Sequence, residues 1–223
     1  MRDAPIHIYP DTDVLVLVDV QPDFMPGGAL PVPSGDAVVS VINRLLERFA
    51  HAVATQDWHP TDHASFASQH PGKQPFDTVM LSYGEQTLWP DHCVQGTPGA
   101  ELHHGIDTSK IELVVRKGFR RTIDSYSAFR ENDRTTRTGL NGYLRERGFQ
   151  RVFVVGLARG YCTDFTAEDA ADLGFKVLLV EDACRGITQE ATDAGTRRLA
   201  AKGVCLVDSA YFVAGLRETP RRG

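Results

Sequence analysis

The sequence predicts an α/β protein with three layers, in which helices cover both faces of a central, mostly parallel sheet of six strands. Short β-rich runs alternate with helix-like stretches along the 223 residues, and this alternation is typical of parallel sheets with helical crossovers. Residues 14–18 form an unbroken apolar run, as a strand covered on both faces requires. We expect a single domain spanning residues 1–223.

The elements follow in chain order from local patterns. The expected strands are β-branched or apolar runs at residues 14–18, 52–55, 111–115, 152–155, 176–180 and 204–207. Ser34 and Asp36 offer capping groups for a first helix, whose apolar residues recur at helical spacing as far as Phe49. Three further helices are expected at residues 138–147, 163–173 and 191–201, and Gly148 and Gly203 are typical residues just beyond helix ends.

One long segment, at about residues 57–110, interrupts this alternation. It is rich in Pro, Gly, His and aromatic residues, and a long irregular insertion in a compact domain is usually functional. The tail at residues 217–223 holds Pro, Gly and three Arg, so we expect it to be irregular.

Composition excludes several classes of protein. A net charge of −5 argues against nucleic acid as a partner. No apolar run approaches the roughly 20 residues of a membrane span, and the first residues show no secretory apolar region. Four cysteines lie without CxxC spacing, so we expect reduced thiols and a cytoplasmic protein. Self-association into a homo-oligomer is left open.

Reactive side chains follow four of the expected strands. They are Asp19, the pair Asp57 and His59, Lys117, and Cys162. Open α/β sheets bind ligands beyond the carboxyl ends of their strands, so these groups should meet at one edge. Each taken singly has an ordinary explanation, as a turn acid, a loop pair, a solvated lysine or a small buried thiol. Their joint placement favours a reaction site.

Cys162 is the candidate nucleophile. It follows an apolar run that stops at Gly156, and after a short turn it opens a helix. The free backbone N–H groups and the dipole of a helix start favour negative charge, so they stabilise a thiolate. The same N–H groups suit the oxyanion of an acyl intermediate.

Asp57 and His59 have the spacing of a metal-ligand pair, because residues i and i+2 of an extended chain project to the same side. A third ligand is needed. The histidines of the insertion are candidates: His63, His70, His92, His103 and His104. We favour His92, within the rigid segment LWPDHC, over His63. Such a site with open positions suits Zn²⁺, Fe²⁺ or Mn²⁺.

Several segments together resemble the nicotinamidase/pyrazinamidase family of the isochorismatase-like cysteine hydrolase superfamily. The resemblance runs in order from about residue 14 to about residue 208. It rests on DVQPDF at 19–24, GGALPVP at 27–33, QDWHP at 56–60, SFAS at 65–68, WPDHCVQ at 89–95, KG at 117–118, DSYSAF at 124–129, GLA at 156–158 and YC at 161–162.

The resemblance implies a role for each matching residue. The implied catalytic triad is Asp19, Lys117 and Cys162, and the implied metal ligands are Asp57, His59 and His92. Phe24 and Trp89 would flank the substrate ring, and the amides of Ala158 and Cys162 would form the oxyanion hole. The family often has a cis peptide at the position of Leu157–Ala158.

The implied function is hydrolysis of nicotinamide to nicotinic acid and ammonia through a cysteine thioester, and also of pyrazinamide. This places the protein in NAD salvage, with one divalent metal ion, zinc before iron or manganese, and a small aromatic amide as substrate. Two alternatives stay open. One is a related amidase with another amide substrate, and the other is a catalytically inactive binding protein, although no triad residue is missing. A dinucleotide-binding fold is disfavoured because no GxGxxG follows the first strand.

The chain departs from the family pattern at one point. The family usually reads GLATDYC, whereas this chain has Arg159 and Gly160 at the fourth and fifth positions. This change alters the charge and the backbone freedom beside the nucleophile. Two interpretations are open: the change alters the choice of amide substrate, or it has no effect on the site. In the second case Arg159 points to solvent or to a subunit interface.

Overall fold

The computed structural model describes residues 5–214, and the predicted tail at 217–223 lies outside them. The central sheet has six strands in the order β6-β3-β2-β7-β8-β9, and every neighbouring pair is parallel. The prediction of a parallel six-stranded sheet is therefore confirmed. The strands are β2 (Asp13–Val18), β3 (Ala52–Asp57), β6 (Leu113–Lys117), β7 (Arg151–Arg159), β8 (Lys176–Gly186) and β9 (Cys205–Val207).

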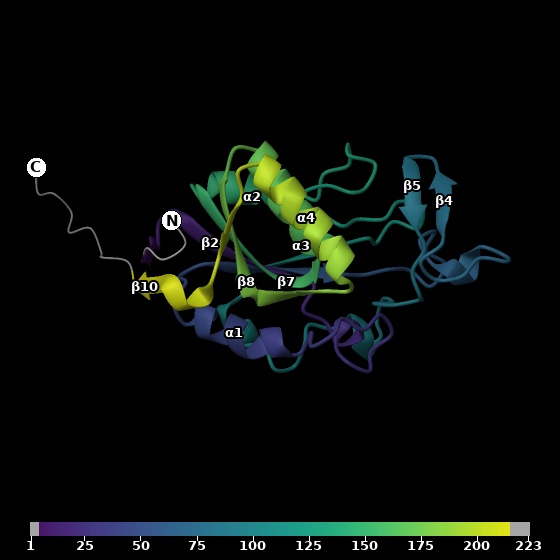
Figure 1. Cartoon of the computed structure of the whole chain (residues 1–223), viewed down its shortest axis with the longest axis horizontal. Helices are drawn as coiled ribbons and strands as arrows, with labels where there is room; N and C mark the ends of the chain where they lie inside the picture. The colour runs from purple at the N-terminus through teal and green to yellow at the C-terminus, as the bar shows by residue number, and fades with distance from the viewer. Residues whose placement is uncertain (1–4, 215–223) are drawn as a thin grey trace, which may run out of the picture.

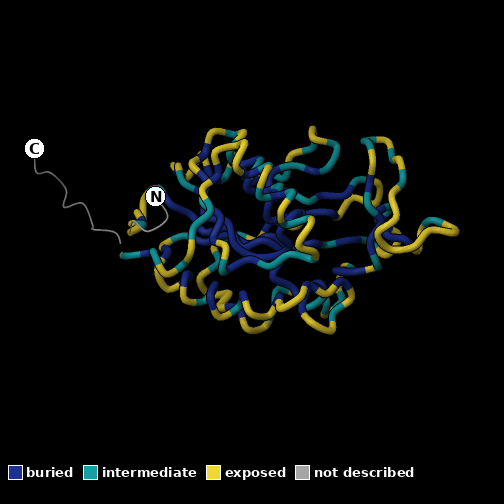
Figure 2. Tube along the Cα trace, in the orientation of Figure 1, coloured by how far each residue is buried: buried dark blue, intermediate teal, exposed yellow. Residues whose placement is uncertain are grey.

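Helices cover both faces of this sheet, as Figure 1 shows. Helix α1 (Ala37–Leu46) lies on one face, and α2 (Leu140–Glu146), α3 (Cys162–Asp172) and α4 (Gln189–Ala201) lie on the other. Alternate residues of β2 point to opposite faces, so Leu15 and Leu17 pack with the α1 side while Val14 and Val16 pack with the α3 side. The central strands β2, β3 and β7 are buried along nearly their whole length (Figure 2), which explains the continuous apolar runs of β2 and β7.

Strand β7 is longer than its sequence pattern predicts. The expected strand covers residues 152–155, but pairing with β8 continues to Arg159, with register shifts between Val154 and Gly156 and between Leu157 and Arg159. Gly156 has a φ of +115°, which only glycine adopts readily, and its Cα faces the backbone of Val18. The glycine therefore bends the strand without ending it. Only residues 160 and 161 are left as a turn before α3.

The insertion at residues 57–110 is largely irregular, as expected, but it contains an antiparallel hairpin that the sequence did not reveal. Strands β4 (Thr78–Leu81) and β5 (Gly84–Thr87) form it, and it projects from one end of the molecule (Figure 1). Two further short strands, β1 (Ile6–Ile8) and β10 (Phe212–Ala214), pair in parallel. Single 3-10 turns occur at Pro22–Phe24, Ala67–Gln69, Pro98–Ala100, Thr108–Lys110 and Ser209–Tyr211.

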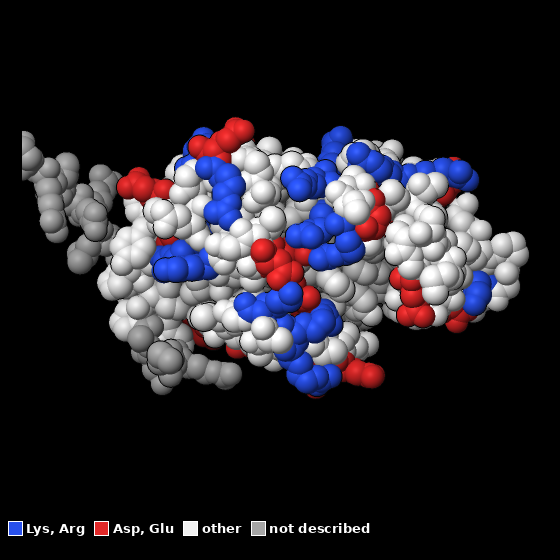
Figure 3. Space-filling view, turned by 90° about the horizontal axis from the view of Figure 1, so that it is seen from above, with Lys and Arg blue, Asp and Glu red and all other residues white. Residues whose placement is uncertain are grey.

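Charged side chains of both signs lie on the surface of the molecule. Basic and acidic side chains are interspersed on the face seen in Figure 3, so that face carries no extended field of one sign. Between residues 5 and 214, no helix is both long enough and apolar enough to cross a membrane.

We predict that Gly156→Ala destabilises the fold. A Cβ at this position would lie 2.1 Å from the Val18 carbonyl oxygen and would also have to adopt a positive φ, so the free energy of unfolding should fall by at least about 2 kcal/mol. Gly142→Ala in α2 is the matched control, because nothing lies within 4 Å of its added Cβ. It should raise stability by about 0.5–1 kcal/mol. Denaturant unfolding of both variants measures the difference, and similar values would contradict the close approach at Gly156.

Candidate active site

The strand order brings the predicted reactive residues to one edge of the sheet. Asp57 and Lys117 are the last residues of β3 and β6, Asp19 directly follows β2, and Cys162 opens α3 after β7. These four strands are consecutive neighbours in the sheet. Their carboxyl ends therefore meet, as the pattern of strand ends predicted.

Lys117 lies at the centre of the site with its side chain completely buried. Its Nζ is 2.7 Å from Asp19 Oδ2 and 2.5 Å from Asp57 Oδ1. It also donates to the carbonyl oxygen of Ser125 at 2.8 Å and lies 3.4 Å from Cys162 Sγ. Burial opposes the charged form, but Asp19 and Asp57 outweigh it and hold the pKa of Lys117 well above its usual range. The lysine is thus a fixed ammonium ion.

The two carboxylates beside Lys117 differ in their affinity for protons. Burial and the nearby charge of Asp57 raise the pKa of Asp19 to about 6. Burial also acts against ionisation of Asp57, but the Lys117 ammonium and His59 hold the pKa of Asp57 below its usual range. Asp19 is therefore the better proton acceptor of the pair, and Asp57 stays ionised.

Thr55 orients Asp19, and the sequence analysis missed it. The Thr55 hydroxyl donates to Asp19 Oδ1 at 2.6 Å and accepts from the Asp19 backbone N–H at 3.1 Å. Asp19 Oδ2 accepts no hydrogen bond of favourable geometry, although it forms the ion pair with Lys117. Because Thr55 occupies Oδ1, Oδ2 is the oxygen that can take up a proton while it stays beside Lys117. In the sequence, Thr55 is visible only as a threonine within an expected strand. Its contact with Asp19 depends on the register between β2 and β3, which the sequence does not give.

Cys162 is the first residue of α3 and is buried. One oxygen of Asp19 and one of Asp57 lie within 4.8 Å of its sulfur and of each other. Burial raises the pKa of the Cys162 thiol well above its usual range, and Lys117 only partly opposes this. Because the thiol is desolvated, it is protonated at rest, and the contribution of the helix start to a thiolate stays a prediction. The peptide bond Leu157–Ala158 is cis, as the resemblance implied.

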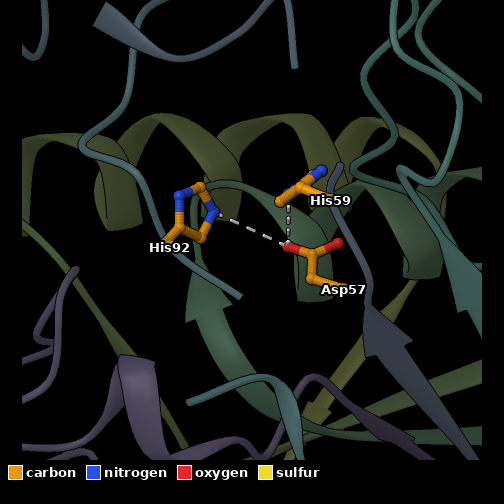
Figure 4. A group of neighbouring side chains, drawn as sticks. All are labelled: Asp57, His59 and His92. Atoms are coloured by element: carbon orange, nitrogen blue, oxygen red, sulfur yellow. Dashed lines mark ion pairs between the residues drawn. The ribbon is translucent and has the colours of Figure 1, made fainter. Parts of the chain in front are cut away.

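Asp57, His59 and His92 form a group with the composition of a metal site (Figure 4). Asp57 Oδ2 lies 3.6 Å from His59 Nε2 and 3.9 Å from His92 Nε2. The other ring nitrogen of each histidine lies at hydrogen-bonding distance from a backbone carbonyl, 2.8 Å from Gly118 for His59 and 2.7 Å from Pro90 for His92. These bonds fix Nδ1 as the donor and leave both Nε2 lone pairs facing Asp57. The residues therefore fit a divalent cation.

The His63 ring lies beside His59, with centroids 4.4 Å apart. It forms a second close group with His59 and Asp124, and its Nδ1 lies 2.7 Å from the Ser65 hydroxyl. Burial of the His92 ring and the nearby charge of His59 lower the pKa of His92 to about 4, so its imidazole is neutral at pH 7. The geometry favours His92 over His63 as the partner of Asp57.

Gln21 is another residue that the sequence analysis missed. Its side-chain amide accepts from the Asp57 N–H at 2.8 Å and donates to the Asp57 carbonyl at 2.9 Å, so it holds the backbone of Asp57 from both sides. It also donates to the Ala100 carbonyl at 2.9 Å. The insertion is thereby tied to the end of β3.

Cys162 forms part of the lining of a small cavity at this edge of the sheet. Phe24 and Trp89, the residues expected to flank the substrate, line it, and so do Tyr126 and Tyr161, which the sequence analysis did not single out. The Trp89 ring lies edge-on to Tyr161 with centroids 5.0 Å apart. Aromatic walls around a few converging polar groups are typical of a site for a small flat molecule.

Arg159 does not line this cavity. It is 4% exposed, so the interpretation that it points to solvent is wrong. Its Nε donates to Asp164 Oδ1 at 2.7 Å and its Nη2 to Thr196 Oγ1 at 2.8 Å.

Comparison with known proteins identifies the class. The isochorismatase domain matches residues 13–210 of the chain, so the protein is a hydrolase of the isochorismatase type. It is 49% identical over 199 residues to a nicotinamidase of Acinetobacter baylyi, covering 85% of this chain and 93% of that protein. The chain therefore belongs to the nicotinamidase/pyrazinamidase family.

Solved structures agree with this assignment. One is the Pnc1 protein of L. infantum in complex with nicotinate, with a TM-score of 0.84, 43% identity and coverage of 94% of this chain and 99% of that one. Another is the pyrazinamidase of Pyrococcus horikoshii in complex with zinc, with a TM-score of 0.73, 36% identity and coverage of 88% and 98%.

We predict that Lys117→Met strongly destabilises the protein, because it leaves two buried carboxylates without their cation. The free energy of unfolding should fall by about 3–5 kcal/mol. Lys202→Met is the control: its 2.7 Å pair with Asp172 is exposed at the surface, and its loss should cost less than about 1 kcal/mol. Denaturant unfolding in the presence of a chelator measures both. If both variants lose the same free energy of unfolding, the buried pairs of Lys117 contribute no more to stability than an exposed surface pair.

Proposed function

We propose that the protein hydrolyses nicotinamide to nicotinic acid and ammonia through a thioester at Cys162, and that it also hydrolyses pyrazinamide. The observation that carries this proposal is the convergence of Asp19, Lys117 and Cys162 beneath an aromatic cavity. The metal-type group of Asp57 and two histidines lies at the same cavity. Membership of the nicotinamidase family supports the choice of substrate.

The first step is activation of the thiol. The resting thiol is protonated because it is buried, so it needs a base. Asp19, with its raised pKa and its open Oδ2, takes the proton from Cys162. Lys117 stays charged throughout and stabilises the thiolate that forms 3.4 Å away.

The thiolate then attacks the carboxamide carbon. A C–S bond forms, and the carbonyl oxygen becomes an oxyanion that accepts from the backbone N–H groups of Ala158 and Cys162. The protonated Asp19 gives its proton to the leaving amine, the C–N bond breaks, and ammonia departs. A water molecule cleaves the thioester with Asp19 again as the base, which releases nicotinic acid and restores the thiol.

The walls of the cavity orient the pyridine ring. Phe24 and Trp89 flank it, and Tyr126 and Tyr161 complete the aromatic enclosure. Contact on both faces of the ring fixes the amide against the sulfur, which lowers the entropic cost of the attack.

Asp57, His59 and His92 would hold the metal ion, which we propose to be zinc, with iron or manganese as alternatives. The zinc complex of the related pyrazinamidase supports this choice. A bound divalent cation supplies a Lewis acid for the ring nitrogen of the substrate or for water. The ligand atoms of the three residues lie within 4.8 Å of one another, as a single ion requires.

We further propose that the protein acts in NAD salvage in the cytoplasm, since the product of the reaction is nicotinic acid. The four cysteines are free thiols, as expected of a reducing compartment. The single-domain organisation over residues 1–223 stays a prediction, and self-association stays open.

We predict that the purified protein releases ammonia from nicotinamide and pyrazinamide, and that Cys162→Ala abolishes the release without loss of the fold. An enzyme-coupled ammonia assay with a panel of heteroaromatic and ureido amides measures the preference. Cys205→Ala is the control, because Cys205 is an exposed thiol, and it should retain full activity. Appreciable turnover by Cys162→Ala would overturn the thioester mechanism, and a strong preference for a ureido amide would overturn the proposed substrate.

We predict that the purified protein contains about one transition-metal ion per chain, and that the Asp57→Ala/His59→Ala variant loses it. Elemental analysis after dialysis measures the content, and His104→Ala serves as the control because His104 is exposed and lies outside the three-residue group. If the double variant keeps its metal, the ion binds elsewhere. If the metal-free protein is fully active, the ion has no part in the reaction.

A further inference from the structure

The pair Arg159 and Gly160, which departs from the family pattern, lies directly before the nucleophile. We propose that Arg159 is a positioning residue that fixes the turn at residues 160–161, and with it the backbone N–H groups that hold the oxyanion. This inference rests on the proposed function, because those N–H groups matter only if an oxyanion forms.

Arg159 joins three elements of the fold. It is the last residue of β7, its Nε donates to Asp164 of α3, and its Nη2 donates to Thr196 of α4. The side chain is 5% exposed and that of Asp164 is fully buried. A guanidinium offers donors in a rigid fork, so one side chain ties the end of the strand to both helices at once.

The Asp164 carboxylate depends on Arg159. The only ion pair that Asp164 forms within the described residues is the one with Arg159, and besides Arg159 it accepts only from the Thr163 hydroxyl. Its Oδ2 accepts no hydrogen bond and lies against Gly195 of α4, where an added Cβ would sit 1.8 Å away. A buried carboxylate without its cation is strongly unfavourable, so the ion pair forces Arg159 to stay inside the fold.

Helix α4 also supports the turn directly. Gly160 has a φ of +86°, and a Cβ there would lie 2.7 Å from the Ala191 carbonyl oxygen. The Gly160 carbonyl accepts from Arg198 Nη2 at 3.0 Å, and Arg198 is held by Glu168 of α3 at 2.7 Å. Glycine at position 160 thus permits the close approach of α4, and that approach brings Thr196 within reach of Arg159.

The turn held in this way separates the two oxyanion donors. Ala158 precedes it and Cys162 follows it, while Tyr161 within the turn lines the cavity. Arg159 itself lies outside the cavity. A looser turn should therefore reduce stabilisation of the transition state more than binding of the substrate.

The test compares Arg159→Met with Arg151→Met. Arg151 forms a similar pair with the buried Asp13 at the other end of β7, with Nε 2.8 Å from Asp13 Oδ1, so its loss should lower stability without moving the turn. We expect Arg159→Met to lower kcat by about 10- to 100-fold with little change in KM, and Arg151→Met to keep kcat. Equal kcat in the two variants, or a loss confined to KM, would overturn the proposal.

Thr196→Val provides a milder variant that keeps the buried ion pair. It removes the hydrogen bond from Arg159 to α4, together with the hydroxyl's own hydrogen bond to the Thr192 carbonyl within α4. It should fold even if Arg159→Met does not, and it should lower kcat by a smaller factor in the same direction. A kcat equal to that of the unsubstituted protein would contradict the role of α4 in fixing the turn.

Hydrogen exchange of the backbone amides at residues 158–163 tests the turn without any substrate. Exchange should become faster in Arg159→Met and in Thr196→Val, and should stay unchanged in Arg151→Met. Because this measurement does not need turnover, it separates failure of the positioning role from failure of the proposed amidase activity. Unchanged exchange in both turn variants would show that the turn is held without Arg159.

Discussion

The ammonium ion of Lys117, buried between Asp19 and Asp57, is the interaction on which the rest of the site depends. It compensates two carboxylates that water cannot reach, and a buried ion pair is tolerable only when its remaining donors are also satisfied. The third contact, to the Ser125 carbonyl, meets that condition. The lysine also connects the proposed reaction centre to the metal-type group, because each carboxylate belongs to one of them.

This arrangement gives two identical side chains different chemistry. Asp19 has a hydroxyl partner and a raised pKa, which suits a base that takes and returns a proton. Asp57 faces the ammonium and two imidazoles and stays ionised, which suits a metal ligand. Lys117 and Thr55 come from strands beside β2 and β3, and Gln21 fixes the Asp57 backbone, so the distinction depends on the surroundings of the carboxylates rather than on the carboxylates alone.

The part of the site around Cys162 depends on backbone geometry rather than on charged side chains. The thiol and the proposed oxyanion donors depend on the end of β7 and the start of α3, and both lie against α4. Figure 1 shows α3 and α4 on the same face of the sheet. The sheet edge thus positions the ionised side chains, and the helical layer positions the N–H groups. Arg159 belongs to the second set, which explains why it is buried but absent from the cavity wall.

The sequence by itself determined the parallel sheet and the set of reactive residues, because a doubly covered strand must be apolar and its reactive groups follow its carboxyl end. It also favoured His92 over His63 from local context. Only the tertiary structure decided the length of β7, the partners Thr55 and Gln21, and the burial of Arg159. The physical reason is that these features arise from strand register and from contacts between distant segments. Whether a glycine ends a strand, or an arginine faces water, depends on the neighbours that the fold supplies.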